Sequence, residues 1–221
     1  MKIVYVPCYS KLDPLPILEK NIGDLKGFKR IGICSTVQYL PYLKSLSLML
    51  SSEGFKAVEC GQVLGCDVSV AQESKEKVDC YLYVGSGMFH PTAIALETGK
   101  RVFKLDPELQ NLSFIEDDEV GKIRKKRKGN VSRALDASTF GLLVSTKTGQ
   151  MDLKDALKIK KRIGESGRAA FIFAGEEVNP GRVLGFDVDA WVNTACPRIA
   201  EDYFKKPVIN PTDLKYILEE K

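Results

Sequence analysis

The two halves of this 221-residue sequence contain similar short segments in the same order, and this repeat limits the fold more than any other feature. Residues 31–36 (IGICST) resemble residues 141–146 (GLLVST). Further along each half, residues 62–68 (QVLGCDV) resemble residues 182–188 (RVLGFDV). Several matches in one order are not expected by chance, so we interpret the chain as two homologous domains.

The pattern within each half predicts the fold class. Short β-branched runs alternate with longer amphipathic stretches, which is typical of βαβ units and of a parallel sheet covered on both faces. We predict an α/β fold with two homologous repeated domains, each a parallel or mostly parallel sheet flanked by helices. The first domain is expected to span residues 1–113, and the second, with a linking helix, residues 114–221. Strands are predicted at residues 2–7, 30–35, 56–60, 80–85, 101–105, 140–145, 169–173 and 190–194, and helices at 14–25, 40–53, 91–98, 117–135, 153–165 and 211–219.

Composition excludes several classes of function. The net charge of +4 is too small for a general nucleic-acid-binding protein, so we expect no direct contact with nucleic acid. No segment is apolar for long enough to span a membrane, and the N-terminus reads as a strand rather than a signal peptide. The six cysteines are therefore expected to be thiols or metal ligands in a reducing cytoplasm. The basic segment 122–128 is either a solvated helical face or a docking site for a partner.

Residues that could bind a ligand gather where the predicted strands end. In an open parallel sheet, ligands bind outside the carboxyl ends of the strands, because loops and helix N-termini there present free N–H groups. The loop of residues 85–87 could hold a carboxylate or phosphate, or be a tight turn without a ligand. The other candidates could equally be capping, packing or solvated loop residues, and the single histidine excludes a histidine-rich metal site. The candidate binding residues are Gln38, Gly85, Ser86, Gly87, His90, Lys147 and Gln150.

Two cysteines occupy positions suited to metal ligands. Cys66 lies in a glycine-containing loop, and Cys196 follows a predicted strand and precedes Pro197. Both fall at carboxyl ends of strands, although a buried core thiol is the common alternative and is the interpretation we accept for Cys80. The close cysteine spacing of ordinary radical S-adenosylmethionine enzymes and a Walker-type phosphate loop are both missing from the sequence. From residues alone, the chain is a two-domain α/β protein with a candidate thiolate metal site.

Four segments carry a resemblance to a known family: residues 60–66 (CGQVLGC), 85–91 (GSGMFHP), 140–150 (FGLLVSTKTGQ) and 195–198 (ACPR). Together they resemble the second and third domains of the diphthamide-synthesis enzymes of archaea and their eukaryotic relatives, the 2-(3-amino-3-carboxypropyl)histidine synthase family. The resemblance covers essentially the whole chain. It implies a 4Fe-4S cluster held by three cysteines, one from each of three repeated domains, around a central cavity that binds S-adenosylmethionine. Cys66 and Cys196 match the second-domain and third-domain ligands.

The resemblance also implies an activity. Members of this family are non-classical radical transferases that move the 3-amino-3-carboxypropyl group of S-adenosylmethionine to a histidine of translation elongation factor 2. This is the first step of diphthamide synthesis. Elongation factor 2 and an electron donor are thus the expected partners.

One departure from the family leaves the third ligand open. The family's first domain would precede Met1 and has no counterpart here, so we expect a homodimer, a complex with a chain that supplies this domain, or a fragment. Cys8, Cys34 and Cys60 lie near the carboxyl ends of predicted strands and could substitute geometrically for this ligand, but the family motifs do not mark them as ligands. The alternatives are a non-catalytic partner that supports the cluster of a full-length relative and a metal-free α/β protein that binds a small molecule.

Overall fold

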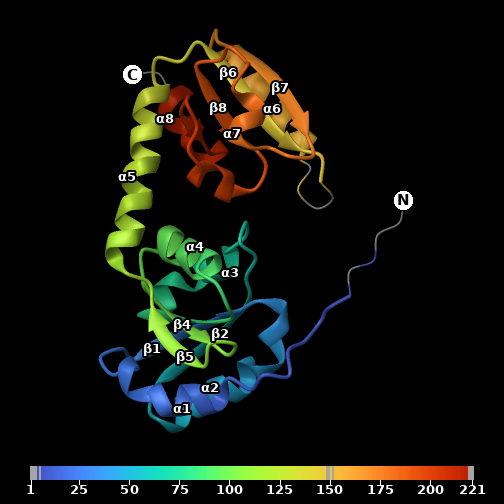
Figure 1. Cartoon of the computed structure of the whole chain (residues 1–221). Helices are drawn as coiled ribbons and strands as arrows, with labels where there is room; N and C mark the ends of the chain where they lie inside the picture. The colour runs from blue at the N-terminus through green and yellow to red at the C-terminus, as the bar shows by residue number, and fades with distance from the viewer. Residues whose placement is uncertain (1–3, 5, 148–149, 151, 219–221) are drawn as a thin grey trace. The chain divides into compact units, whose positions relative to one another are not determined.

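The computed structural model describes residues 4, 6–147, 150 and 152–218, and the chain divides into two compact units. The first unit is Met1–Val120 and the second is Gly121–Lys221. Figure 1 labels the elements of both units. The domain boundary between residues 113 and 114 stays a prediction. None of the helices among the described residues is long and apolar enough to cross a lipid bilayer.

The first unit is built on a five-stranded sheet with the order β2-β1-β3-β4-β5. The first four strands are parallel, and β5 pairs antiparallel with β4 at the edge. The central strands β1 and β3 are buried along almost their whole length, as expected for a sheet covered on both faces. The strands are β1 (Arg30–Ser35), β2 (Lys56–Gln62), β3 (Cys80–Val84), β4 (Arg101–Asp106) and β5 (Asn111–Phe114).

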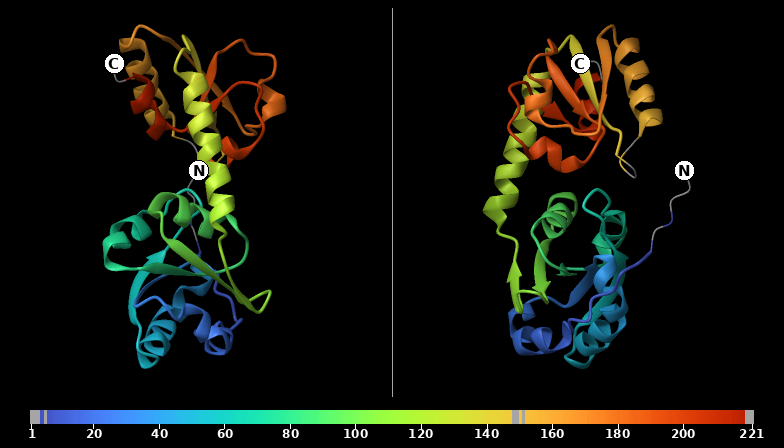
Figure 2. Two further views of the ribbon diagram at one scale, coloured as in Figure 1. Left: turned by 90° about the vertical axis from the view of Figure 1, so that its left-hand side faces the viewer. Right: turned by 45° about the vertical axis from the view of Figure 1, so that its right-hand side comes forward.

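Helices cover both faces of this sheet, as Figures 1 and 2 show. On one face, Leu18 of α1 and Leu46 of α2 pack in a core with Ile33 of β1. On the other face, Ile94 of α4 packs in a second core with Tyr81 of β3. Because side chains alternate along a strand, β1 and β3 contribute to both cores. The helices are α1 (Leu15–Asn21), α2 (Leu43–Ser52), α3 (Ser69–Ser74) and α4 (Phe89–Thr98), with 3-10 helices η1 (Ile22–Leu25), η2 (Val37–Tyr42) and η3 (Lys75–Lys77).

The second unit has an all-parallel sheet of four strands with the order β7-β6-β8-β9. In both units the second strand along the chain lies at the edge beside the first strand, and the third and fourth strands follow on the other side of the first. The repeated α/β architecture predicted from the sequence is therefore confirmed. The strands are β6 (Thr139–Ser145), β7 (Ala169–Gly175), β8 (Ala190–Asn193) and β9 (Val208–Ile209).

Helices also flank the sheet of the second unit. The amphipathic helix α6 begins after Asp152, whose side chain accepts a hydrogen bond from the Asp155 N–H at 2.8 Å, and buries Ile159 and Ile163 against the sheet. On the opposite face, Trp191 of β8 packs in a separate core with Val183 of α7. The helices are α5 (Asp117–Ala134), α6 (Leu153–Glu165), α7 (Pro180–Val183) and α8 (Lys215–Leu218), with 3-10 helices η4 (Pro197–Glu201) and η5 (Pro211–Leu214).

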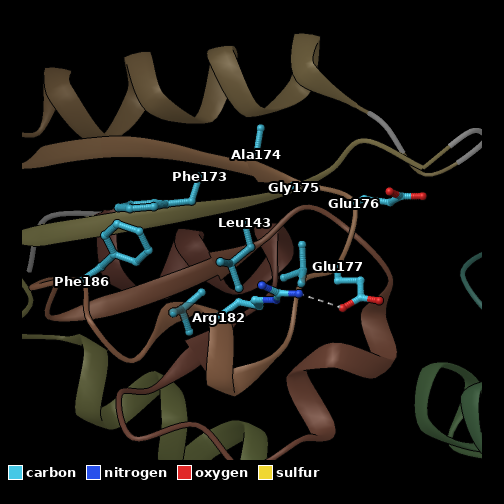
Figure 3. A pocket seen from close by; sticks show the side chains of 10 residues that line it. Leu143, Phe173, Ala174, Gly175, Glu176, Glu177, Arg182 and Phe186 are labelled. Carbon is cyan, nitrogen blue, oxygen red and sulfur yellow. Dashed lines mark ion pairs between the residues drawn. The ribbon is translucent and has the colours of Figure 1, made fainter.

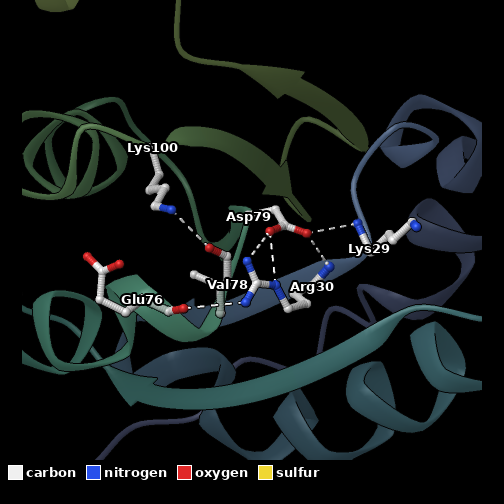
Figure 4. Close-up of polar contacts among 6 residues, drawn as sticks. All are labelled: Lys29, Arg30, Glu76, Val78, Asp79 and Lys100. Carbon is white, nitrogen blue, oxygen red and sulfur yellow. Dashed lines mark hydrogen bonds and ion pairs between the residues drawn. The ribbon is translucent and has the colours of Figure 1, made fainter.

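An aspartate holds the start of the first strand in both units. Asp79 accepts hydrogen bonds from the N–H groups of Lys29 and Arg30 at 3.1 and 2.9 Å and forms an ion pair with the Arg30 guanidinium at 2.6 Å (Figure 4). The hydrogen bonds from the Arg30 side chain and backbone lower the pKa of Asp79 to about 2. In the second unit, Asp189 accepts from the N–H groups of Ser138 and Thr139 at 3.1 and 2.9 Å. The repeat thus preserves a contact that sets the strand register.

A glycine in the first strand of each unit makes room for an aromatic ring on the neighbouring strand. Gly32 of β1 lies opposite Tyr81 of β3, and a Cβ on this glycine would lie 2.8 Å from the Tyr81 ring. In the second unit, Gly141 of β6 lies opposite Trp191 of β8, and a Cβ would collide with the Trp191 ring. The shared glycine therefore reflects a packing requirement on the same face of each sheet.

Some predicted elements differ from the structure. The strand predicted at residues 2–7 falls partly outside the described residues, and Val4, Val6 and Pro7 are exposed and belong to no strand. The α-helix predicted at residues 40–53 begins only at Leu43, because Pro41 lies inside the preceding 3-10 helix. Residue 219 of the last predicted helix lies outside the described residues. The short elements β5, β9, α3 and α7 were not predicted.

Candidate functional site

The loop of residues 85–87 follows the central strand β3 of the first unit and leads into α4. Gly85 and Gly87 have positive φ angles of 150° and 79°, which favour glycine. A Cβ on Gly85 would lie 2.6 Å from the hydroxyl of Tyr83. The hydroxyl of Ser86 donates to Asp106 at 2.8 Å. The loop is thus held in a defined conformation that only glycine permits at its two ends.

Asp106, at the carboxyl end of β4, is the anchor of this loop. Its carboxylate is fully buried and forms an ion pair of 3.1 Å with Lys104, which is itself buried. It also accepts from the N–H groups of Glu108 and Leu109 at 3.1 and 3.2 Å. Burial raises the pKa of Asp106, but the hydrogen bonds from Ser86, Leu109 and Lys104 outweigh burial and leave this pKa below its ordinary value. The carboxylate therefore stays ionised and keeps its partners in place.

His90 lies in the first turn of α4, close to this loop. Its ring stacks on Tyr83 with centroids 5.8 Å apart and an interplanar angle of 10°, and it meets the edge of Phe89. Burial lowers the pKa of His90, because the charged imidazolium loses hydration. Packing against Tyr83 is therefore an established role of His90, and contact with a ligand stays a prediction.

Gln38 lies after the carboxyl end of β1. Its side chain is exposed and its amide oxygen accepts a hydrogen bond from the Thr36 hydroxyl at 2.9 Å. Its carbonyl accepts from the N–H of Ser10 at 2.9 Å. The structure shows these local contacts for Gln38, and its proposed role in binding stays a prediction.

Cys66 lies in a tight turn beyond the carboxyl end of β2. Leu64 and Asp67 close this turn with backbone hydrogen bonds of 2.9 and 3.1 Å, and the thiol of Cys66 is free and exposed. A Cβ on Gly65 would collide with the ring of Phe89, so the turn rests on the start of α4. The structure thus brings Cys66 and the loop of residues 85–87 to the same end of the first unit, through Phe89.

Cys196 lies in the loop after β8, the central strand of the second unit. The buried side chain of Asn193 fixes this loop, because it donates to the Cys196 carbonyl at 2.9 Å and accepts from the N–H of Ala195 at 3.1 Å. The N–H of Ile199 also donates to the Cys196 carbonyl at 2.9 Å, as η4 begins. The thiol itself is free and half-buried. Three hydrogen bonds therefore fix the course of the backbone around this thiol.

A pocket of about 250 Å³ beside Cys196 collects several predicted site residues. Lys147 and Gln150 line it, and Ser145 connects them by accepting from the Lys147 N–H at 3.2 Å and donating to the Gln150 side chain at 3.3 Å. Thr148 and Gly149, which belong to the same sequence segment, lie outside the described residues. The pocket also includes residues that the sequence analysis did not select as site residues: Glu176, Val178, Arg198, Ile199 and Asp202.

The charges around this pocket suit a zwitterion. Lys147 and Arg198 can donate to a carboxylate, and Glu176 and Asp202 can accept from an ammonium group. The two acidic residues lie after β7 and after η4, in segments without a recognisable motif. Only their position at the same sheet edge as Cys196 could have suggested them.

A larger pocket of about 520 Å³ lies beside it in the second unit (Figure 3). Phe173 and Phe186 form part of its wall, with ring centroids 4.5 Å apart, and Arg182 and Glu177, which also line it, form an exposed ion pair of 3.6 Å. Phe186 occupies the position of the repeat that Cys66 occupies in the first half. The second unit therefore carries an aromatic ring where the first carries a thiol, and its own thiol comes from a different loop.

The remaining thiols differ in their surroundings. Cys34 and Cys80 are fully buried within strands, as predicted for Cys80, whereas Cys8 is exposed and Cys60 is half-buried. Among the described residues, no three side chains of metal-binding type lie together as a site. The chemistry of the free, accessible thiols of Cys66 and Cys196 nevertheless fits an iron–sulfur cluster, which is held by thiolates.

Comparison with known proteins identifies a family. A family model described as "Putative diphthamide synthesis protein" matches residues 1–221. The 2-(3-amino-3-carboxypropyl)histidine synthase of Pyrococcus horikoshii is 34% identical over 97% of this chain and 65% of its own length. The enzyme of the same name from Methanocaldococcus jannaschii is 29% identical over 99% of this chain and 63% of its own length. The chain therefore spans slightly less than two thirds of these relatives.

A solved structure supports the same relationship. The crystal structure of Dph2 from Pyrococcus horikoshii with a 4Fe-4S cluster superposes with a TM-score of 0.81 at 34% sequence identity. The match covers 95% of this chain and 63% of that protein. The similarity thus includes the fold as well as the sequence.

Proposed function

The chain belongs to the diphthamide synthesis protein family, and from this premise we propose that it is the cluster-binding part of a 2-(3-amino-3-carboxypropyl)histidine synthase. In this proposal, it takes part in the transfer of the 3-amino-3-carboxypropyl group from S-adenosylmethionine to a histidine of translation elongation factor 2. The names of the relatives support this reaction, because they state the product group. The reaction, its substrates and its partners belong to the proposal, since the chain spans only part of these relatives.

The observation that carries the proposal is the position of two free thiols. Cys66 is exposed beyond the end of β2, and Cys196 lines a pocket beyond the end of β8. We propose that these two residues provide two of the thiolates that hold a 4Fe-4S cluster, the group present in the related Dph2 structure. When bound, a cluster with one iron free of protein ligands would supply the electron and the iron contact needed for carbon–sulfur bond cleavage.

The pocket beside Cys196 would position the amino-acid end of S-adenosylmethionine. Lys147 and Arg198 would donate hydrogen bonds to its carboxylate, and Glu176 or Asp202 would accept from its ammonium group. The volume of about 250 Å³ is below the roughly 300–1,000 Å³ of typical small-molecule sites, which suits part of a ligand rather than a whole nucleoside. The role of these side chains is thus to orient the group that is transferred.

The first unit would contribute backbone donors. The loop of residues 85–87 precedes α4, and its N–H groups are the expected contacts for an anionic group of the substrate, with Gln38 and His90 nearby at the same sheet edge. Asp106 would keep the loop in its binding conformation through Ser86. The partners in this proposal are elongation factor 2, an electron donor, and either a second copy of this chain or a chain with the family's first domain, which would supply the remaining thiolate.

A cleavage assay tests the proposal directly. Cleavage of the bond to the aminocarboxypropyl group leaves 5′-methylthioadenosine, whereas cleavage of the bond to the adenosyl group leaves 5′-deoxyadenosine. We expect anaerobically reconstituted protein with a strong reductant to release 5′-methylthioadenosine, and Cys196→Ala to abolish this release. Cys80→Ala is the matched control, because Cys80 is a buried core thiol.

The outcomes separate the candidate functions. If the protein contains iron and sulfide but releases no 5′-methylthioadenosine until a longer relative is added, the chain is better described as a non-catalytic partner. A colourless protein that binds no iron after reconstitution, alone or with such a relative, would contradict the cluster and leave a metal-free α/β binding protein.

A further inference from the structure

Two thiols outside the candidate site lie on one face of the sheet in the first unit. In the pairing of β1 with β2, Ile33 lies opposite Glu59 and Cys34 lies opposite Gly61, so Cys60 is the extra residue of a β-bulge. A bulge redirects a side chain relative to the regular pleat. The sulfur of Cys60 lies 3.0 Å from the position that a Cβ on Gly32 would take. Cys60 therefore reaches across β1, on the side of the sheet that Gly32 shares with Cys34.

Both thiols belong to the same core, but they differ in access. Cys34 is fully buried in the core on the α3 and α4 side, and Cys60 packs against this core while remaining half-buried. Because β2 is the edge strand and Cys60 is only half-buried, we expect a small reagent to reach Cys60 before Cys34. Cys34 is then the inner thiol and Cys60 the outer thiol of a pair.

The surroundings of the outer thiol change its pKa. The Cys60 thiol donates a hydrogen bond to the hydroxyl of Ser74 at 3.1 Å, and this hydroxyl lies 3.2 Å from that of Tyr81. The hydrogen bond with Cys34 is the main cause that lowers the pKa of Cys60 to about 7, against the effect of burial, with Ser74 and the charge of Lys77 contributing. The same hydrogen bond and burial raise the pKa of Cys34. One proton is thus retained on Cys34 while Cys60 becomes the thiolate.

We propose that Cys60 and Cys34 form an oxidant-reactive dithiol, in which Cys60 is the site modified by a peroxide and Cys34 is the resolving thiol. The Cys60 thiolate attacks one oxygen of hydrogen peroxide, so that a sulfur–oxygen bond forms, the oxygen–oxygen bond breaks and hydroxide leaves. Cys34 then attacks the sulfenic sulfur, a disulfide forms and water leaves. The two thiols lose two electrons and two protons, and one peroxide becomes two molecules of water.

Peptide mapping of the full-length chain tests the dithiol. The protein is treated with hydrogen peroxide, the remaining thiols are blocked with iodoacetamide, and the peptides are analysed by mass spectrometry. We expect a Cys34–Cys60 cross-link in the wild type that both Cys34→Ser and Cys60→Ser remove. In Cys34→Ser, dimedone should capture Cys60 as the sulfenic acid.

Cys80 is the matched internal control. It lies in β3 on the opposite face of the sheet, and burial, with the nearby charge of Asp79, raises its pKa to about 12. In untreated wild type at neutral pH, iodoacetamide should modify Cys60 at least roughly tenfold faster than Cys80, because the thiolate is the nucleophile. This comparison uses only the wild-type protein, so it does not depend on whether a variant folds. Equal alkylation rates, or no Cys34–Cys60 cross-link at a peroxide dose that oxidises the exposed Cys8 and Cys66, would overturn the proposal.

Discussion

At the scale of single residues, Asp106 shows how a candidate binding loop is held. The glycines at both ends of the loop of residues 85–87 permit its conformation, but they do not select it. The buried carboxylate selects it, because it binds Ser86 on the loop and Lys104 two residues earlier in the same strand, β4. The loop therefore depends on a charge pair that is shielded from water.

We expect Asp106→Asn to lower the free energy of unfolding by about 3–5 kcal/mol, because it leaves the buried Lys104 ammonium without its counter-charge. Urea denaturation of the full chain measures this loss. The matched control is Asp117→Asn, which breaks an exposed ion pair of 3.1 Å with Arg101 and should cost about 0–1 kcal/mol. Equal losses in the two variants would contradict the role given to the buried pair.

At the scale of elements, an aspartate from another segment binds the start of the first strand in each unit. A glycine lies near the start of the same strand. Asp79 and Asp189 accept from backbone N–H groups at the strand start. Gly32 and Gly141 then leave space for an aromatic ring of the next strand. These contacts explain why the repeat is visible in the sequence at these positions.

The aspartate contact predicts a pH dependence. The pKa of Asp79 is about 2 in the folded protein, below its ordinary value, so its contribution to stability is complete above about pH 5 and is lost as the pH falls towards about 2. Asp79→Asn should therefore destabilise the protein at neutral pH, and the difference from wild type should shrink as the pH falls. Urea midpoints at several pH values measure this effect. Asp24→Asn, at an exposed aspartate, is the control, and a constant difference for Asp79→Asn would refute the prediction.

The glycine contact predicts a packing effect. Gly141→Ala places a methyl group against the Trp191 ring and should lower the free energy of unfolding by roughly 1–3 kcal/mol. Thermal denaturation followed by Trp191 fluorescence reports on this site, because Trp191 is the only tryptophan. Gly164→Ala in α6 has open space around the new Cβ and should instead stabilise the helix by up to roughly 1 kcal/mol. A neutral Gly141→Ala would show that the ring can move aside.

At the scale of the whole molecule, the two candidate cluster ligands do not occupy equivalent positions of the repeat. Cys66 follows the edge strand β2, whereas Cys196 follows the central strand β8. Phe186 takes the position equivalent to Cys66. The two units have therefore diverged at the ends of their strands while keeping the same strand order.

We expect Cys66→Ala and Cys196→Ala each to abolish the bound iron and brown absorbance of reconstituted protein, and the double variant to lose no more than either single variant. The reason is that one cluster would need both thiolates, so removing either removes the whole site. Iron and sulfide analysis measures the loading, with Cys80→Ala as the control that retains it. Partial losses that add in the double variant would indicate two separate metal sites.

The sequence by itself determined the repeated parallel architecture, because strand burial and helix amphipathicity follow from local periodicity. It also determined that Cys66 and Cys196 end up beyond the carboxyl ends of strands, since that follows from their place after β-branched runs. The short edge strand β5 was missed, because its pairing with β4 depends on a chain reversal near Gln110, at a φ angle of 51°, rather than on its own pattern.

Only the tertiary structure decided which distant residues meet. Glu176 and Asp202 join Lys147 and Arg198 around one pocket because parallel strands place their carboxyl ends at a common edge. Cys34 and Cys60 become neighbours because of a single bulge between β1 and β2. Local sequence patterns do not encode such contacts, since they arise from the register and packing of segments that are far apart in the chain.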